Sequence, residues 1–155
     1  TGGCLDSGGS FGSSSGLEGI AINPTDTYAY IVKNSNSRID KCAINSGNGF
    51  LSSCVNSGAS GLAFPELITI NSAGTLAYIG NNGSGGFVSR CTINSGTGNL
   101  SSCVSVNSVF DFQGPKQVAF NSAGTRAFIT NSGNSTVATC TVDSNGDFIF
   151  VNWQK

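Results

Sequence analysis

Six cysteines are the most reactive side chains in this sequence, and histidine is absent. Without histidine the chain lacks the commonest general base, the usual serine-type catalytic triads and most zinc sites. Of the eight carboxylates, Glu18 and Glu66 stand at equivalent points of an internal repeat, where Lys116 is the third member. Carboxylates gathered there could bind a cation or a sugar, but the lysine favours a salt-bridged or solvated rim. We therefore predict no metal site, no cofactor and no catalytic residue.

The run from Asp143 to Asp147 resembles the opening of a calcium loop. Such a loop needs a glutamate further on, and none follows here. The equivalent runs in the other repeats, which begin at Asn45 and Asn94, are plain turn sequences. We therefore predict a hairpin turn at this point. Asn82 heads one of several possible glycosylation sequons, which are expected by chance in a chain this rich in asparagine and serine.

Four of the cysteines form two pairs with the same spacing. Cys42 and Cys54 are 12 residues apart, as are Cys91 and Cys103, and a glycine-rich turn lies midway in each case. Directly opposed residues of an antiparallel hairpin have Cβ atoms close enough for a disulfide. Each predicted disulfide closes a loop of about a dozen residues and should stabilise the fold by about 3 kcal/mol.

The elements that position these cysteines repeat three times along the chain. Cys42, Cys91 and Cys140 are separated by 49 residues each, and every repeat contains four short apolar runs joined by tight turns. Gly74 and Gly124 fall in the first turn of their repeats, where a positive φ is needed, and Asp26 takes that place in the first repeat. The repeats span residues 17–58, 65–106 and 115–153.

Four strands in a unit of this length match one blade of a β-propeller. We therefore predict an all-β fold, with three four-stranded antiparallel blades in a single domain over residues 1–155. An extended stack of hairpins or an irregular β-solenoid is the alternative.

The end of the second strand in each repeat carries a more specific signal. Phe128-Ile129-Thr130-Asn131, with Tyr78-Ile79-Gly80-Asn81 as a looser copy, resembles the signature of the YVTN-repeat propellers. The Asn-Ser-Ala-Gly-Thr turn before it is also typical of that family, whereas the first repeat departs from the signature. The resemblance covers nearly the whole chain. It implies a propeller of a secreted or surface protein and supplies no catalytic residue.

Cys4 and Cys140 lack partners in this scheme. Asn152 stands 12 residues after Cys140, and Cys4 lies 50 residues before Cys54, as though residues 1–16 contained the fourth strand of a missing blade. The expected bond joins Cys4 to Cys140, within one chain or between chains, so that this N-terminal strand complements a last blade.

Three blades are too few to close a propeller, which typically has four to eight. Three explanations remain open. Two chains could close a six-bladed ring, contacts between chains could continue into a filament, or the chain is a piece of a longer propeller.

Composition restricts where the protein could act. Lys and Arg total 7 and are scattered, so nucleic acid is not an expected partner, and no apolar run is long enough to insert in a membrane. Methionine is absent and cysteines are frequent, which favours an exported chain whose signal peptide has been removed. The expected location is secreted or on the cell surface.

Aromatic residues occupy the segments that join one repeat to the next. These side chains could form a sugar-stacking or protein-binding face, or they could fill the gaps between blades, which we favour. They are Phe11, Phe64, Phe110 and Phe112.

The leading functional hypothesis is a secreted, non-enzymatic structural or adhesive protein that assembles with itself. It rests on the two unpaired cysteines and on the lack of a catalytic constellation. The alternative is a lectin that binds glycans as a closed oligomeric ring. The third reading is a fragment of a longer propeller with an enzymatic or binding role.

Overall fold

The computed structural model of this chain describes residues 4–9, 11, 16–106 and 112–149. These residues form twelve strands and one short 3-10 turn, η1 (Asn34–Asn36). The strands are β1 (Leu17–Ile22), β2 (Tyr28–Lys33), β3 (Arg38–Ile44), β4 (Leu51–Asn56), β5 (Pro65–Ile70), β6 (Leu76–Asn81), β7 (Phe87–Ile93), β8 (Leu100–Ser105), β9 (Pro115–Phe120), β10 (Arg126–Asn131), β11 (Thr136–Val142) and β12 (Phe148–Ile149).

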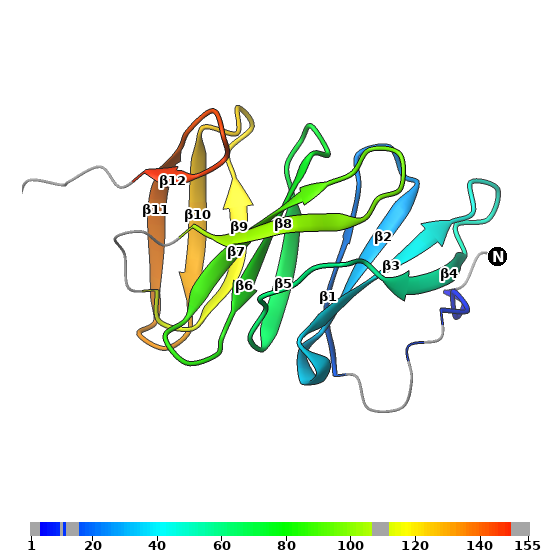
Figure 1. Ribbon diagram of the computed structural model, residues 1–155, viewed down its shortest axis with the longest axis horizontal. Helices are drawn as coiled ribbons and strands as arrows, with labels where there is room; N and C mark the ends of the chain where they lie inside the picture. The colour runs from blue at the N-terminus through cyan, green and yellow to red at the C-terminus, as the bar shows by residue number, and fades with distance from the viewer. Residues whose placement is uncertain (1–3, 10, 12–15, 107–111, 150–155) are drawn as a thin grey trace, which may run out of the picture.

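The strands form three antiparallel sheets of four, each built from consecutive strands. We call them blade 1 (β1–β4), blade 2 (β5–β8) and blade 3 (β9–β12). The blades stand side by side in chain order, with the N-terminal segment beside blade 1 (Figure 1). The first strands make the inner side of the arrangement, where β5 contacts both β1 and β9. The predicted all-β architecture of three four-stranded blades is confirmed.

The first hairpin of each blade closes through one asparagine. In blade 2 the amide oxygen of Asn71 accepts the backbone N–H groups of Thr75 and Leu76 at 2.9 and 3.0 Å. Asn side chains stabilise turns in this way because they copy a backbone acceptor. The turn also needs a left-handed residue, and Asp26, Gly74 and Gly124 have φ values of 54°, 70° and 68° there, as predicted.

The core lies between blades. Val32 and Ile39 of blade 1 pack with Ile68 and Ile79 of blade 2, and all four side chains are nearly inaccessible. An equivalent cluster joins blade 2 to blade 3. Each blade therefore hides its two apolar faces only where it has a neighbour on that side.

A tyrosine hydroxyl crosses each of these joints. Tyr30 of blade 1 donates to the carbonyl of Gly98 in blade 2, and Tyr78 of blade 2 donates to the carbonyl of Gly146 in blade 3, both at 2.8 Å. Burial raises the pKa of both tyrosines to about 12. The two joints are thus built from the same contact, one repeat apart.

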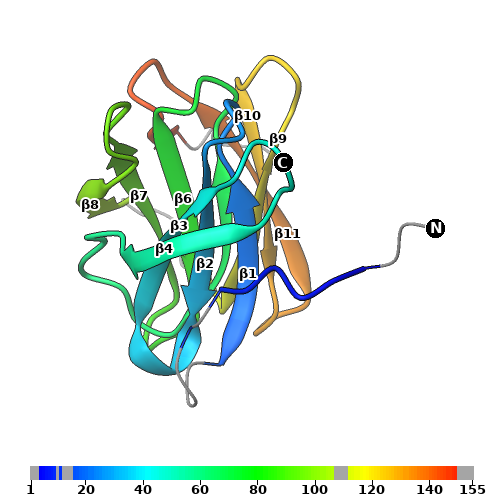
Figure 2. The ribbon, with the colours of Figure 1, turned by 90° about the vertical axis from the view of Figure 1, so that its right-hand side faces the viewer.

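The predicted disulfides Cys42–Cys54 and Cys91–Cys103 are present, and each links the third strand of its blade to the fourth. Cys4 is exposed, Cys140 is buried, and both are free thiols. Cys140 belongs to β11 of blade 3, whereas the N-terminal segment lies beside blade 1, which it contacts through Ser7 (Figure 2). The expected bond between Cys4 and Cys140 is not formed within one chain.

Among the described residues, no helix is long and apolar enough to span a membrane.

Candidate functional site

The best-defined charged site lies where the inner strands begin. Glu66, the second residue of β5, is only 8% exposed, and its Oε1 accepts from Lys116 Nζ at 2.7 Å. Lys116 holds the same position in β9 of the next blade. The pair forms because equivalent residues of adjacent inner strands face each other across the joint between blades 2 and 3. The predicted salt-bridged rim is present here.

Asn82 completes this site from a different element. It follows β6 at the start of the β6–β7 loop, and its Nδ2 donates to the same Glu66 Oε1 at 3.0 Å. The backbone N–H of Asn82 donates to the carbonyl of Phe64, which ties the loop to the segment entering β5. Two donors therefore converge on one carboxylate oxygen, a charge-assisted arrangement that fixes the carboxylate in one orientation.

Glu18 takes the equivalent place in β1 but is exposed. The equivalent residue of the adjacent strand β5 is Glu66, which carries the same charge. The carboxylate pair considered from the sequence is thus asymmetric: Glu66 is held by a cation and an amide, whereas Glu18 faces solvent.

A groove of about 340 Å³ opens beside Asn82 on the same end of the molecule. Gly86, Gly114 and Gly133 line it, together with Phe112 and Gln113. An added Cβ at Gly86 would lie 2.6 Å from the carbonyl oxygen of Phe112, so the backbone here approaches too closely for any other residue. Glycine at this point therefore permits the close approach of the segment that enters blade 3.

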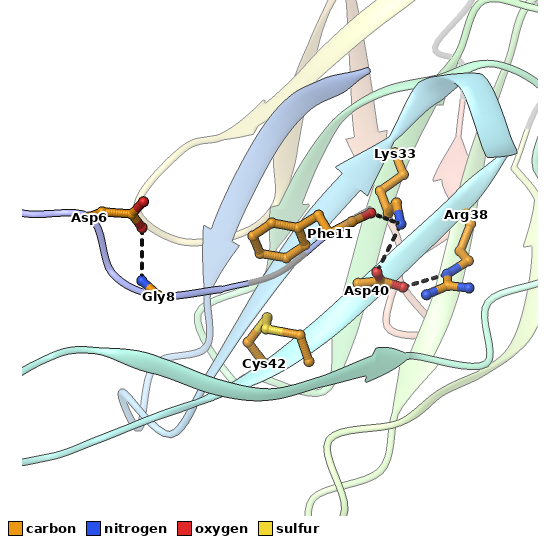
Figure 3. Close-up of a disulfide and its surroundings, with 8 residues drawn as sticks. Asp6, Gly8, Phe11, Lys33, Arg38, Asp40 and Cys42 are labelled. Atoms are coloured by element: carbon orange, nitrogen blue, oxygen red, sulfur yellow. Dashed lines mark hydrogen bonds and ion pairs between the residues drawn. A yellow bond between two sulfur atoms is a disulfide. The ribbon is translucent and has the colours of Figure 1, made fainter. Parts of the chain in front are cut away.

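A second ionic cluster lies inside blade 1 (Figure 3). Lys33 Nζ approaches Asp40 Oδ2 at 3.3 Å, and Arg38 Nε donates to Asp40 Oδ1. Burial alone would raise the pKa of Asp40, but the hydrogen bonds and charges of Arg38 and Lys33 outweigh burial and hold that pKa below its usual range. Lys33 Nζ also donates to the carbonyl of Phe11 at 2.7 Å. This cluster is enclosed and connects strands, so we assign it to stability.

The predicted aromatic face is divided between different environments. Phe112 is 1% exposed in the core between blades 2 and 3, as the gap-filling interpretation expects. Phe11 packs against the apolar side of blade 1. Phe64 is 57% exposed and has a φ of 49°. Phe110 lies outside the described residues.

A larger groove, of about 600 Å³, lies at the opposite, hairpin end between blades 2 and 3. Leu76, Phe120 and Val142 are among the residues that line it. Within the part of the chain that the structure describes, no cluster of three or more histidine, cysteine, aspartate or glutamate residues could hold a metal ion.

One member of the site at Glu66 escaped the sequence analysis. Asn82 stood out only as a possible glycan acceptor, because nothing in the sequence shows that its loop folds back on β5. The pairing of Glu66 with Lys116 was visible only as an alternation of charge between repeats.

The fold places this chain among the β-propellers. A protein of Bacteroides fragilis provisionally named a 6-phosphogluconolactonase matches with a TM-score of 0.71 and 14% identity, over 90% of this chain and 38% of that one. The periplasmic gluconolactonase of Pseudomonas aeruginosa matches with a TM-score of 0.63 and 17% identity, over 87% and 38%. A gluconolactonase of Xanthomonas campestris matches with a TM-score of 0.57 and 18% identity, over 77% and 36%.

The chain therefore spans less than half the length of these neighbours. At such identities the likeness shows the fold. No protein-family model and no curated protein sequence matches the chain.

These neighbours correct the functional expectation from the sequence. The prediction of a non-enzymatic structural or adhesive protein is wrong, because the solved structures with this blade arrangement include proteins named as lactonases. The prediction treated the lack of histidine as evidence against catalysis, but a carboxylate can also serve as a general base. The two disulfides fit an extracellular or periplasmic location.

Proposed function

We propose that this chain carries the active site of an exported lactone hydrolase of the YVTN-repeat kind, acting on a sugar-derived lactone at the end of the blades where Glu66 lies. The observation that carries the proposal is the buried carboxylate of Glu66, which Lys116 and Asn82 hold on one oxygen. Asn82 also lines an open groove. Neighbours named as 6-phosphogluconolactonase and gluconolactonase supply the substrate class. The two disulfides support export to an oxidising compartment.

Opening a lactone is an acyl transfer to water, so it needs a base for the water and a positive group for the developing oxyanion. In this proposal Glu66 takes the proton from the attacking water through Oε2, while its contacts on Oε1 hold it in place. The side chain of Lys116 is 36% exposed, so its remaining donors can reach a substrate. The positive charge of Lys116 would also attract the phosphate group of a phosphorylated lactone.

The test is the rate of ring opening of glucono-δ-lactone and of 6-phosphoglucono-δ-lactone, followed by proton release against the uncatalysed background. We expect acceleration of at least one of them, and a loss of about 100-fold or more in kcat for Glu66→Gln, since general-base catalysis typically contributes 10²–10⁴-fold. Asp26→Asn, at the hairpin end, is the control and should keep full activity. Circular dichroism of each variant checks folding. A rate equal to background for both lactones would overturn the proposal.

A further inference from the structure

The first strand of blade 1 exposes a side chain that the other blades bury. Ile20 in β1 is 59% exposed, whereas its counterparts Ile68 in β5 and Val118 in β9 are 4% and 2% exposed. Ile68 and Val118 are covered by the blade that precedes theirs. A groove of about 470 Å³, lined in part by Ile20, Ile31 and Phe11, occupies the place of that blade next to blade 1.

Blade 3 shows the complementary exposure on its other side. Val137 in β11 is 61% exposed, whereas its counterparts Ile39 and Val88 are fully buried by the blade that follows. Phe128 in β10 is 40% exposed, whereas Tyr78 is 2% exposed. The molecule therefore ends in two exposed apolar faces. Inside the chain, faces of these two types pack against each other at each joint between blades.

We propose that the open face of blade 3 (Phe128 and Val137) docks on the open face of blade 1 (Ile20, Ile31 and Leu51) of a second copy of this chain. Two such joints close one ring of two copies with six blades, a number within the range of closed propellers. This proposal concerns an interaction surface and does not depend on the proposed activity.

Charge at the inner strands favours a second copy as the occupant. Equivalent residues of adjacent blades meet across a joint, as Glu66 and Lys116 do at 2.7 Å. In the proposed joint the neighbour of Lys116 is Glu18 of the second copy, so opposite charges face each other. Glu18 is exposed within one chain and gains a cation on docking.

The N-terminal segment already follows the path of a linker that arrives from a preceding blade. The carbonyl of Ser7 accepts from Leu51 N at 3.0 Å, as the carbonyl of Ser57 accepts from Leu100 N at 2.7 Å in the true linker between blades 1 and 2. The glycine that follows each serine has a positive φ, which is 80° at Gly8 and 91° at Gly58. Residues 7 and 8 are therefore held as a linker although no blade precedes them in the structure.

A buried polar side chain at the end of the second strand holds the linker in both cases. Asn81, the last residue of β6, accepts from Ala63 N at 3.0 Å. Lys33, the last residue of β2, donates to the carbonyl of Phe11 at 2.7 Å. The same device thus positions the segment that enters blade 1 (Figure 3).

This path places Cys4 at the end of a fourth strand that belongs to the preceding blade. In blade 3 the described part of the fourth strand, β12, pairs only with Thr141 and Val142. Among the described residues none pairs with Cys140 on the edge of β11 that faces away from β10. In the proposed ring, residues 4–6 of the second copy pair there and bring Cys4 opposite Cys140, as Cys54 stands opposite Cys42. Oxidised glutathione can join the two thiols: the thiols lose two electrons and two protons, and the oxidant becomes two molecules of reduced glutathione.

The proposed joint lacks two polar contacts of the internal joints. Phe128 stands at the position of Tyr78 but has no hydroxyl to donate. Thr139 stands at the position of Arg90, whose guanidinium donates to the carbonyl of Asn145 at 2.9 Å. The turn of blade 1 that would accept both contacts, at Asn48 and Gly49, is exposed. Restoring both donors with Phe128→Tyr and Thr139→Lys should therefore tighten the joint.

The experiment measures the mass of the reduced 155-residue chain by light scattering over a range of concentrations. We expect a dimer, twice the 15.7 kDa of one chain. Ile20→Lys and Val137→Lys should each shift it to monomer, because each buries a charge in the joint. Val104→Lys is the matched control, since Val104 is 46% exposed on β8, outside both faces. The Phe128→Tyr/Thr139→Lys variant should remain dimeric at lower concentrations than the parent chain.

Oxidation supplies an independent readout. With oxidised glutathione, a covalent dimer should appear on a non-reducing gel and be lost in Cys4→Ser, while the Cys4→Ser chain stays dimeric by light scattering. A monomer at every concentration overturns the proposal, as does a dimer that both lysine variants leave intact. Open-ended multimers overturn the closed ring. Lactone hydrolysis enters none of these measurements, so either proposal can fail without the other.

Discussion

At the residue scale, Asp40 shows how blade 1 differs from its copies. Blade 2 has Ser89 and Asn81 where blade 1 has Asp40 and Lys33, and the two polar side chains of blade 2 are joined by a 3.0 Å hydrogen bond. In blade 1 an ion pair replaces that bond, with both side chains at most 6% exposed. A buried charge left without its partner is costly, so this position tolerates either the polar pair or the ionic one, and not a mixture.

Asp40→Asn should therefore destabilise the protein by about 3–5 kcal/mol at pH 7, because Lys33 would stay buried without its counter-charge. The pKa of Asp40 is lowered in the folded state, so the unfolded chain takes up the proton first as pH falls. The stabilisation is complete above the unfolded pKa of about 4 and disappears as pH falls through the lower folded value. Urea unfolding at pH 7 and at pH 3 measures both effects.

The parent chain should lose more stability between these two pH values than Asp40→Asn does. Asp26→Asn, an exposed turn variant that keeps a residue tolerant of positive φ, serves as the control. Equal pH dependence of the parent and of Asp40→Asn would contradict this assignment.

At the element scale, the hairpin between β11 and β12 is part of a joint. Gly146 has a φ of 82°, and an added Cβ there would collide with Tyr78 Oη and Leu76 of blade 2. The carbonyl of Gly146 also accepts the Tyr78 hydroxyl. The turn needs glycine both for its backbone conformation and for the close approach of the neighbouring blade.

Gly146→Ala should cost about 1–3 kcal/mol more than Gly124→Ala in the free energy of unfolding. Gly124 has a φ of 68° in the same blade, but an added Cβ there meets nothing within 4 Å. Both substitutions place an alanine in the strained left-handed region, whereas only Gly146→Ala also disturbs packing against the neighbouring blade. Equal losses in chemical denaturation would show that the tyrosine contact does not restrict this turn.

At the scale of the whole molecule, stability is distributed along a row of three blades. Blade 2 packs on both faces, against blade 1 through one core cluster and against blade 3 through another. In the part of the chain that the structure describes, each outer blade has a neighbouring blade on one face. In such arrays each unit is stabilised by its contacts with its neighbours, so the outer units open first.

Amide hydrogen exchange should accordingly be slowest in β6 and β7 and faster in β1 and at β12. The difference should be clearest at concentrations where the chain is monomeric, because docking of a second copy would cover β1. Mass spectrometry of peptides after deuterium labelling measures this order. Exchange from β1 as slow as from β6 in the monomer would contradict it.

The residues that could be interpreted from the sequence are those with local roles. The spacing of Cys42 to Cys54 predicted a disulfide across one hairpin, and Gly74, Gly124 and Asp26 marked positive φ in a turn. Each depends on residues close together in the chain, so the backbone geometry of a hairpin was enough. The function was not predicted correctly, because the absence of histidine says nothing about how a carboxylate is held.

The sequence by itself determined three blades, their strands and two of the three expected disulfides, because each follows from the period of the repeat. Only the tertiary structure decided which face of each repeat is covered. It brought Lys116 and Asn82 to one oxygen of Glu66, buried Phe112 and left Ile20 and Val137 exposed. These outcomes depend on the order of the blades in space. Equivalent residues of the repeats differ in exposure where one of them lacks a neighbouring blade, as Ile20 does and Ile68 does not.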